Sequence, residues 1–215
     1  TAFLTPMNAE GVKIEEFLWT FNMPTDHGTV SFSDVYVDNA SIFGEEGHGL
    51  QIVQHFFNEN RIRQAASSLG AAQYCINESV KYAQERKPFG KPLSTNQGIQ
   101  FPLVELNTTA AMLRALIHKT AWQMDKYGAF SVSDQVSMCN YIGNRLCCDA
   151  ADRAMQTHGG LGYSRHKPFE HIYRHHRRYR ITEGAEEIQM RRIAGYMFGY
   201  MKQQAPKGVK SVTGI

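Results

Sequence analysis

The spacing of apolar residues changes once along the chain, at about Gly49, and that change sets the class of fold. After this point apolar residues recur about every 3.6 positions, which is the period of one helical face. The stripe consists of Leu50, Val53, Phe56, Phe57, Ile62, Ala65, Leu69, Ala72, Ile76 and Val80. It predicts a helix to about residue 84, much longer than the average of about 11–12 residues. A helix of this length is typical of a helical bundle.

Breaks in the same period predict the helices that follow. Residues 85–92 contain two prolines and a glycine, which end the first helix. A good helix start at 94–97 predicts a second helix to about residue 126. A third is expected from 131–134 to 157, ended by Gly159 and Gly160, then a short one over 168–178 and a last one over 186–201. Because the connections are short, we expect a mainly α fold, an up-and-down bundle over residues 44–203.

Residues 1–43 have the pattern of strands rather than helices. Segments 1–6 and 12–16 alternate or run apolar, and 29–32 is followed by a break at Ser33 and Asp34, after which 35–37 is expected to resume a strand. Such short strands cannot form an independent core. We therefore expect residues 1–43 to be the end of a β domain that is mostly missing from this chain, and the start at Thr1 suggests a fragment or a processed form. Residues 204–215 are expected to be a flexible tail.

Composition excludes several classes of protein. Apolar residues make up 42% and charged residues 20%, and the net charge of +3 is too small to indicate a nucleic-acid partner. Cys75, Cys139, Cys147 and Cys148 have no metal-binding spacing, so free, partly buried thiols and no metal site are expected. No apolar run approaches the ~20 residues of a membrane span.

Glu183 is a candidate catalytic residue because it stands directly before a glycine. Gly184 leaves room for a ligand to approach closely, and partial removal of water makes a carboxylate a stronger base. Glu183, Glu186 and Glu187 have a second interpretation, since acidic residues in a first helical turn are favoured by the helix dipole. Glu186 and Glu187 fit that interpretation better than Glu183 does, because they lie further into the predicted helix.

Two segments near Glu183 have a binding and a structural interpretation each. Residues 159–162 read Gly-Gly-Leu-Gly, which could cradle a phosphate with backbone N–H groups or could cap a helix and turn. They do not match the dinucleotide fingerprint and they follow a helix. The second segment is basic and could bind phosphates, although a solvated helix with inter-subunit ion pairs is favoured over a nucleic-acid reader. It contains Arg165, His166, Lys167, His171, Arg174, His175, His176, Arg177, Arg178 and Arg180.

Two further groups of residues could contact a ligand. Arg61 lies among amide side chains on an apolar helix, so it needs either a structural salt bridge or an anionic ligand. Arg86, Phe89 and Gln97 place a cation, an aromatic ring and an amide around one loop, where they could hold a phosphate and stack on a ring. The alternative is a loop with a packed phenylalanine.

The order and spacing of these motifs resemble the C-terminal half of the acyl-CoA dehydrogenases, over about residues 1–203. The motifs are Phe-Ser-Asp-Val-Tyr-Val at 32–37, Gly-Glu-Glu-Gly-His-Gly at 44–49, Asn-Glu-Asn-Arg at 58–61, Tyr-Ala-Gln-Glu-Arg-Lys-Pro-Phe-Gly-Lys-Pro at 82–92 with Gln97, Gln-Thr-His-Gly-Gly-Leu-Gly-Tyr at 156–163, Tyr-Arg at 173–174 and Ile-Thr-Glu-Gly at 181–184. The resemblance implies a flavoenzyme that introduces an α,β double bond into an acyl-CoA thioester.

The resemblance also implies a role for particular residues. Glu183 would be the base that removes the α-proton while a hydride leaves the β-carbon for FAD. Some branches carry the base just before the arginine of the first bundle helix, but that position is Asn60 here, which cannot serve. The substrate contacts would be Asn58, Arg61 and Gly184. The FAD contacts would be Arg86, Phe89, Gln97, Gln156, Gly159 and Gly160, serving a neighbouring subunit, together with Ala185 and Glu187.

Three positions depart from the family pattern. Ala185 stands where a threonine hydroxyl usually helps to hold FAD, Thr182 replaces a common aromatic residue, and Glu187 brings a carboxylate to the place of a neutral amide. The family also has an N-terminal helical domain and a β domain before the matching part, so the resemblance covers only its C-terminal portion.

The implied partners are an acyl-CoA substrate, an electron-transferring flavoprotein and further copies of the chain in a homodimer or homotetramer. Neither a nucleic-acid partner nor a membrane span is expected, and the implied location is the cytoplasm, or the mitochondrial matrix of a eukaryote. Two alternatives stay open at this point: a non-catalytic nucleotide-binding or oligomerisation module, and an acyl-CoA oxidase within the enzyme class.

Overall fold

The computed structural model describes residues 1–21 and 23–201, and it divides into two compact units, Thr1–Phe57 and a second one from Asn58 onward. The boundary falls inside the first long helix, α1 (Gly49–Glu85). The tail expected over 204–215 lies outside the described residues. Each unit is therefore described by itself.

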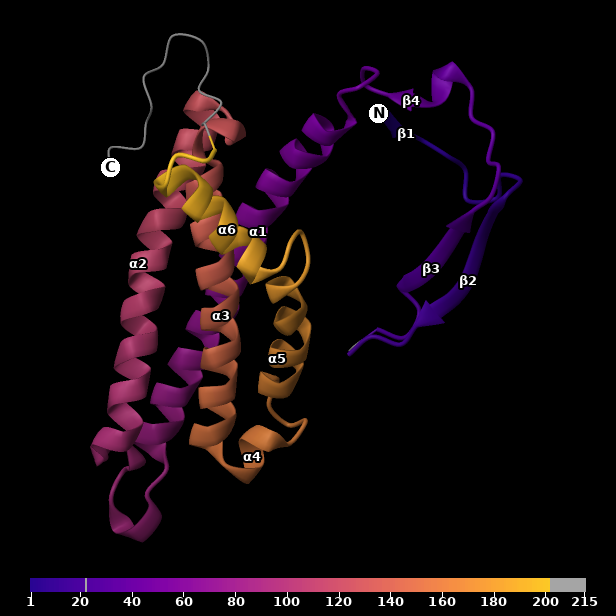
Figure 1. The fold of residues 1–215 in the computed structure, drawn as a ribbon. Coiled ribbons are helices and arrows are strands. Elements are labelled where there is room, and N and C mark those ends of the chain that lie inside the picture. Colours follow the sequence, from indigo (N-terminus) through magenta and orange to yellow (C-terminus); the bar gives the residue numbers. More distant parts are fainter. Residues whose placement is uncertain (22, 202–215) are drawn as a thin grey trace. The chain divides into compact units, whose positions relative to one another are not determined.

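The first unit consists of two small antiparallel sheets (Figure 1). In one, β1 (Ala2–Phe3) pairs with β4 (Ile42–Phe43), and in the other, β2 (Val12–Leu18) pairs with β3 (His27–Phe32). Most side chains of β2 are exposed. The β2–β3 hairpin therefore buries little apolar surface within this unit.

The prediction of a strand at 35–37 is wrong, because these residues form no strand, and the short strand β4 was not predicted. After β3 the backbone of Asp34 enters the left-handed region, with φ at +50°, which turns the chain out of the β2–β3 ladder. The Ser33 N–H donates to the Gly11 carbonyl at 2.9 Å and ends the pairing. Ile42–Phe43 is too short to show an alternating pattern, so its pairing with β1 left no local signal.

The second unit is the helical bundle that the sequence predicts (Figure 1). The residues from Asn58 to the end of α1 are followed by α2 (Gln97–Tyr127), α3 (Ser133–His158), the single turn α4 (Gly160–Tyr163), α5 (Phe169–Arg177) and α6 (Glu186–Met197). α1, α2 and α3 run up and down through short connections. The last helix ends before the predicted residue 201, because Gly199 turns the backbone with φ at +77°.

Helix α3 lies at the centre of this unit, where it packs against α2, α5 and α6. Its buried positions face all of these neighbours, and small residues let the backbones come close. A Cβ added at Gly143 would lie only 3.2 Å from the Cα of Ala65, so α1 and α3 nearly touch there. The core is formed by Ala65, Leu69, Ala72, Cys75, Ile76, Ala110, Leu113, Ile117, Cys139, Leu146, Cys147, Ala150, Ala151, Ala154 and Phe169.

The cysteines are buried free thiols, as the sequence predicts. Burial raises the pKa of Cys75 to about 12 and that of Cys139 to about 11, so both remain protonated at neutral pH. Across residues 1–21 and 23–201, none of the helices is long and apolar enough to cross a membrane. In the same residues, no group of three or more His, Cys, Asp and Glu side chains is arranged to hold a metal ion.

Candidate active site

Glu183 lies in a short loop between a 3₁₀ turn (Arg178–Arg180) and α6. Its φ is +52° and that of Gly184 is +95°, so two successive residues occupy the left-handed region. For a non-glycine residue this conformation costs roughly 1–3 kcal/mol, and it persists only where the surroundings hold it. The loop therefore holds Glu183 in a conformation that needs support from neighbouring elements.

That support comes from two buried side chains that bind the loop carbonyls. Arg61 donates from Nε to the Glu183 carbonyl at 3.0 Å, and its Nη2 donates to the same oxygen. Gln189 donates from Nε2 to the carbonyls of Glu183 at 3.1 Å and Gly184 at 2.8 Å. Arg61 is 2% exposed and Gln189 is 1% exposed. Burial, and then the nearby charge of Arg192, lowers the pKa of Arg61 to about 10, which leaves it protonated at neutral pH.

The Glu183 carboxylate faces two amides of α1, one helical turn apart. Asn60 donates from Nδ2 to Oε1, and Gln64 donates from Nε2 to Oε2. Asn140 of α3 fixes Gln64 in turn, because its Nδ2 donates to the Gln64 Oε1 at 3.1 Å and to the Arg61 carbonyl at 3.2 Å. The close approach of α1 and α3 at Gly143, one turn after Asn140, allows this contact. Each carboxylate oxygen is thus oriented by one neutral donor.

The three acids of this segment differ in what they bind. A carboxylate has about four acceptor directions; among the described residues Glu183 uses two of them, for the two amides. Glu186 accepts four N–H bonds from Arg145 and Arg180. Glu187 is exposed in the first turn of α6. Only Glu183 combines a fixed orientation with acceptor capacity left for a proton.

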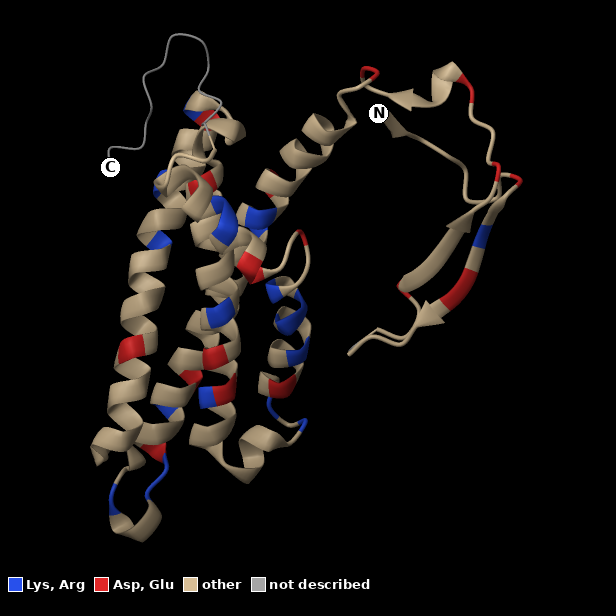
Figure 2. Ribbon diagram, in the orientation of Figure 1, with Lys and Arg blue, Asp and Glu red and all other residues tan. Residues whose placement is uncertain are grey.

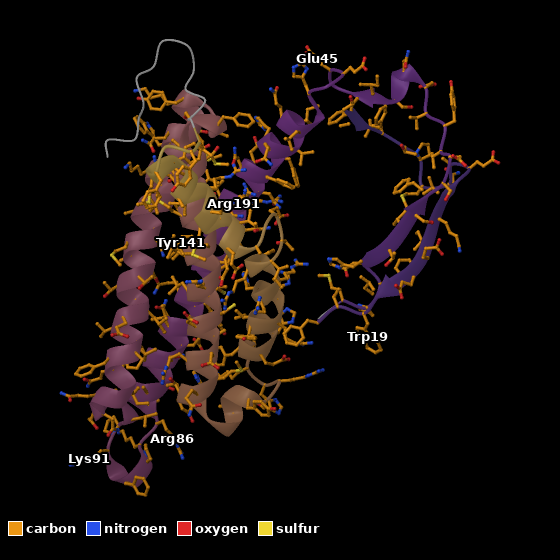
Figure 3. The ribbon with its side chains drawn as sticks, in the orientation of Figure 1. Trp19, Glu45, Arg86, Lys91, Tyr141 and Arg191 are labelled. Carbon is orange, nitrogen blue, oxygen red and sulfur yellow. The ribbon has the colours of Figure 1, made fainter. Side chains whose placement is uncertain are left out.

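Of the predicted FAD contacts, Ala185 and Glu187 lie next to Glu183 at the start of α6, and the others lie at the other end of the bundle. Arg86 directly follows α1, and at 1.5 Å per residue the helix places position 85 about 37 Å from Asn60. Figure 3 shows Arg86 and Lys91 at the opposite end of the unit from Arg191 of α6. The structure therefore brings Asn60, Arg61 and Glu183 together and keeps Arg86 away from them within one chain.

The predicted cofactor contacts at that far end are exposed. Phe89 has φ at +56° and its side chain is fully exposed, and Gln97 is exposed at the start of α2. Gln156 in the last turn of α3 and Gly160 at the start of α4 lie at the same end of the bundle. The ring of Tyr82 on α1 stacks there on His158 of α3, with 4.3 Å between centroids. This end of the unit thus presents two sets of exposed residues from adjacent helix ends.

The glycines after α3 serve different purposes. Gly159, with φ at +61°, ends the helix, and a Cβ at Gly162 would lie 2.5 Å from the Met155 carbonyl, so that glycine allows α4 to pack on α3. Gly160 has an ordinary φ, and a Cβ there would meet nothing within 4 Å. The fold therefore explains two of these glycines and leaves the surface at Gly160 open to close approach.

The basic residues of this segment lie along α5 and the loops beside it (Figure 2), and some of them form ion pairs within the chain. Arg174 on α5 donates from Nε to Glu170 at 2.7 Å, and the Lys167 Nζ lies 3.2 Å from a Glu78 carboxylate oxygen. These ion pairs hold the basic segment to acidic residues of the same chain.

Several site residues were not singled out from the sequence. Gln64, Asn140 and Gln189 are all at least 94% buried, and each carries an amide into the Glu183 network. The one signal available was a polar residue beside an apolar stripe, as with Gln64 next to Ala65, and this does not indicate a partner. Asn58, which the family resemblance implies to be a substrate contact, is fully buried and donates to the Ser133 Oγ at 3.2 Å.

Comparisons with known proteins identify the family to which this helical bundle belongs. A family model described as "Acyl-CoA dehydrogenase, C-terminal domain" matches residues 47–198. The chain belongs to the acyl-CoA dehydrogenase family.

Its relatives are longer than this chain. The protein named "Probable acyl-CoA dehydrogenase FadE2" from Mycobacterium tuberculosis is 32% identical over 193 residues, which cover 89% of this chain and 47% of that protein. The mitochondrial short-chain specific acyl-CoA dehydrogenase of Mus musculus is 32% identical over 92% of this chain and 48% of its own length. A solved glutaryl-CoA dehydrogenase in complex with glutaryl-CoA superposes with a TM-score of 0.82 at 30% identity, covering 94% of this chain and 51% of that one. The chain thus spans about half the length of the relatives it matches.

Proposed function

We propose that this chain is the C-terminal part of an FAD-dependent acyl-CoA dehydrogenase and that Glu183 is its catalytic base. The observation that carries the proposal is the contact between Asn60 and the Glu183 carboxylate. Family resemblance gives two alternative positions for the base, Glu183 and the residue before Arg61. These positions are 123 residues apart in the sequence, yet their side chains meet at one point. A single reacting carbon could therefore be reached from either position, and only Glu183 carries a carboxylate there.

The chemistry required of Glu183 matches its surroundings. It takes the α-proton of the thioester, so a C–H bond breaks, an O–H bond forms, and the electron pair stays on the substrate to become part of the new double bond. Asn60 and Gln64 fix the direction of the carboxylate through neutral donors and leave acceptor capacity for the proton. Arg61 and Gln189 hold the backbone beneath it. Gly184 has no side chain, so the substrate can approach its backbone closely next to the base.

The residues at the far end of the bundle fit a flavin nucleotide that belongs to another subunit. Phe89 offers a fully exposed ring, Arg86 a cation and Gly160 an open backbone surface. With Gln97, Gln156 and Gly159 they form a surface for the adenine and pyrophosphate, while Ala185 and Glu187 approach the nucleotide from the base side. FAD, when bound, accepts the hydride from the β-carbon. Electrons then pass to an electron-transferring flavoprotein, and the functional unit is a homodimer or homotetramer.

Replacing the base tests this proposal in the full-length protein. Glu183→Gln keeps the size of the side chain and one of its two acceptor oxygens, but the amide cannot take a proton. We expect acyl-CoA-dependent bleaching of the flavin absorbance, measured anaerobically in a stopped-flow instrument, to slow by about 10²–10⁴-fold. The matched control is Glu170→Gln, which removes a carboxylate from α5, where it binds Arg174 away from the site.

Two outcomes would contradict the proposal. Bleaching by Glu183→Gln at the wild-type rate would show that another group takes the proton. A full-length protein that binds no flavin would favour the non-catalytic module that the sequence left open.

A further inference from the structure

A second cluster of charged side chains lies beside the loop that bears Glu183, and the mechanism above does not use it. Glu186, the first residue of α6, accepts from the Arg145 Nε and Nη2, both at 3.0 Å, and from the Arg180 Nε and Nη2 at 2.9 and 2.8 Å. Both guanidiniums bind side-on with two parallel bonds, the geometry that adds directional specificity to an ion pair. The Glu186 side chain is only 9% exposed. The four N–H bonds from two guanidiniums use the acceptor directions of its carboxylate.

The three residues come from the two ends of the loop and from the central helix. Arg180 is the last residue before the loop, Glu186 is the first residue after it, and Arg145 belongs to α3. The ion pair between Arg180 and Glu186 therefore joins the two ends of the loop 181–185. Arg145 connects this ion pair to α3. We name Arg145, Glu186 and Arg180 the carboxylate clamp.

The charge state of the clamp does not change near neutral pH. Hydrogen bonds from Arg180 and then from Arg145 hold the pKa of Glu186 down at about 2, and Glu186 raises the pKa of both arginines. The cluster therefore cannot exchange a proton with a substrate under physiological conditions. Its role has to be sought in geometry.

The loop between the clamped ends has a conformation that depends on support from its neighbours. Glu183 occupies the left-handed region, and Ile181 is 60% exposed, so it adds little packing. Arg61 and Gln189 hold the loop carbonyls at its centre, but they do not fix where its two ends lie. Closing both ends on one carboxylate restricts the positions that the Glu183 side chain can reach.

We propose that the carboxylate clamp positions Glu183 for proton transfer. The inference rests on the proposed function, in which Glu183 is the base. Arg145, Glu186 and Arg180 act through Glu183 and are positioning residues, since a misplacement of about 1 Å at a reacting group can cost about 10²-fold in rate. The clamp and the amides of α1 hold different parts of the same residue: the clamp fixes the ends of its loop, and the amides fix its carboxylate.

Two substitutions in the full-length protein test the clamp. Glu186→Gln removes the charge that both guanidiniums share, and Arg180→Lys keeps the charge but cannot make two parallel bonds. We expect flavin reduction by saturating acyl-CoA to slow about tenfold or more in Glu186→Gln and by a smaller factor in Arg180→Lys. The acyl-CoA dissociation constant should stay within about twofold, because the substrate contacts are unchanged. Glu170→Gln, which breaks one two-bond arginine pair on α5, should behave as wild type.

A second measurement does not depend on catalysis. Hydrogen–deuterium exchange of the backbone amides at 181–185 should become about tenfold faster in both clamp variants and stay unchanged in Glu170→Gln. Faster exchange in the loop together with a wild-type rate of flavin reduction would overturn the positioning role, and so would exchange that remains unchanged. If Glu183→Gln itself reduces flavin at the wild-type rate, the proposed function fails, and the exchange data still decide whether the clamp orders the loop.

Discussion

At the scale of single residues, the donors around a carboxylate decide what it can do. Glu183 and Glu186 are three positions apart, yet one faces two neutral amides and the other two guanidiniums. The sequence could single out Glu183 as the candidate base, because Gly184 follows it and because it belongs to the family motif at 181–184. It could not indicate Gln64 or Asn140, because these residues reach Glu183 through contacts between segments that are 76 or more positions apart. Local patterns hold no information on such pairs.

Gly184 gives a direct test of how the loop is held. Its φ is +95°, and a Cβ there would lie 3.3 Å from the Ile188 Cγ2 and 3.4 Å from the Arg61 Nη2. We expect Gly184→Ala to lower the free energy of unfolding by about 1–2 kcal/mol, measured by urea denaturation. The matched control is Gly70→Ala in the exposed middle of α1, where a Cβ meets nothing and should raise the same free energy by about 0.5–1 kcal/mol. Equal shifts in both variants would mean that the left-handed backbone at Gly184 places no constraint on the fold.

At the scale of elements, α5 shows what a helical pattern reveals and what it omits. The sequence predicts a short basic helix, and the structure confirms it within a residue or two. The sequence could not tell that His176 turns inward, since arginines and histidines surround it in the chain. Ser68 of α1 donates to the Asn144 Oδ1 at 2.7 Å, so its oxygen is left to accept from the His176 Nδ1 at 3.0 Å. A polar chain thus joins α1, α3 and α5 inside the core.

The inward position of His176 predicts a loss of stability in mild acid. Burial first, and then the charges of His175, Arg178 and His171, lowers its pKa from 6.5 to about 4. Between these values the unfolded chain binds a proton that the folded chain does not, so stability is complete above about pH 6.5 and falls as the pH drops toward 4. At 1.36 kcal/mol per unit the loss reaches at most about 3 kcal/mol.

Urea denaturation from pH 7 to pH 4 measures this loss. His176→Gln keeps a donor for Ser68 but cannot be protonated, so the fall in unfolding free energy over this range should become shallower. His118→Gln, an exposed change on α2, should leave the wild-type profile intact. A profile that is the same in His176→Gln and in wild type would assign the acid sensitivity to another group.

At the scale of the whole molecule, the distance between the proposed base and the proposed cofactor surface favours an assembly of several chains. The bundle could be predicted because its helices are long and its connections short, which makes the 3.6-residue period and the Pro/Gly breaks clear. The arrangement of the site could not be predicted, since it depends on contacts between helices that are far apart in the sequence. Asn60 and Glu183 lie at one end, and Arg86 and Gly160 lie at the other. A site that uses both ends needs two chains.

Mixed assemblies test whether the two ends belong to different chains. Glu183→Gln inactivates the base end, and a double change of Arg86 and Gln97 to alanine inactivates the cofactor end. If each site takes its base from one chain and its cofactor loop from another, a mixed dimer has one intact site, and random mixing should restore roughly a quarter of wild-type activity. Flavin-dependent turnover of mixtures refolded or co-expressed together measures this. Mixtures as inactive as their parents would mean that each chain completes its own site.

Helix α1 has a further consequence, which concerns length rather than chemistry. From Asn60 to Glu85 it is one unbroken helix that begins beside Glu183 and ends at the loop of Arg86. Adding or removing one turn would change the spacing of the two ends by about 5.4 Å in every subunit. A symmetric assembly would repeat that error at each site. A substitution on the outer face, as at Gly70, leaves the spacing intact. The number of residues between Asn60 and Arg86 is therefore under a tighter limit than the identity of most of them.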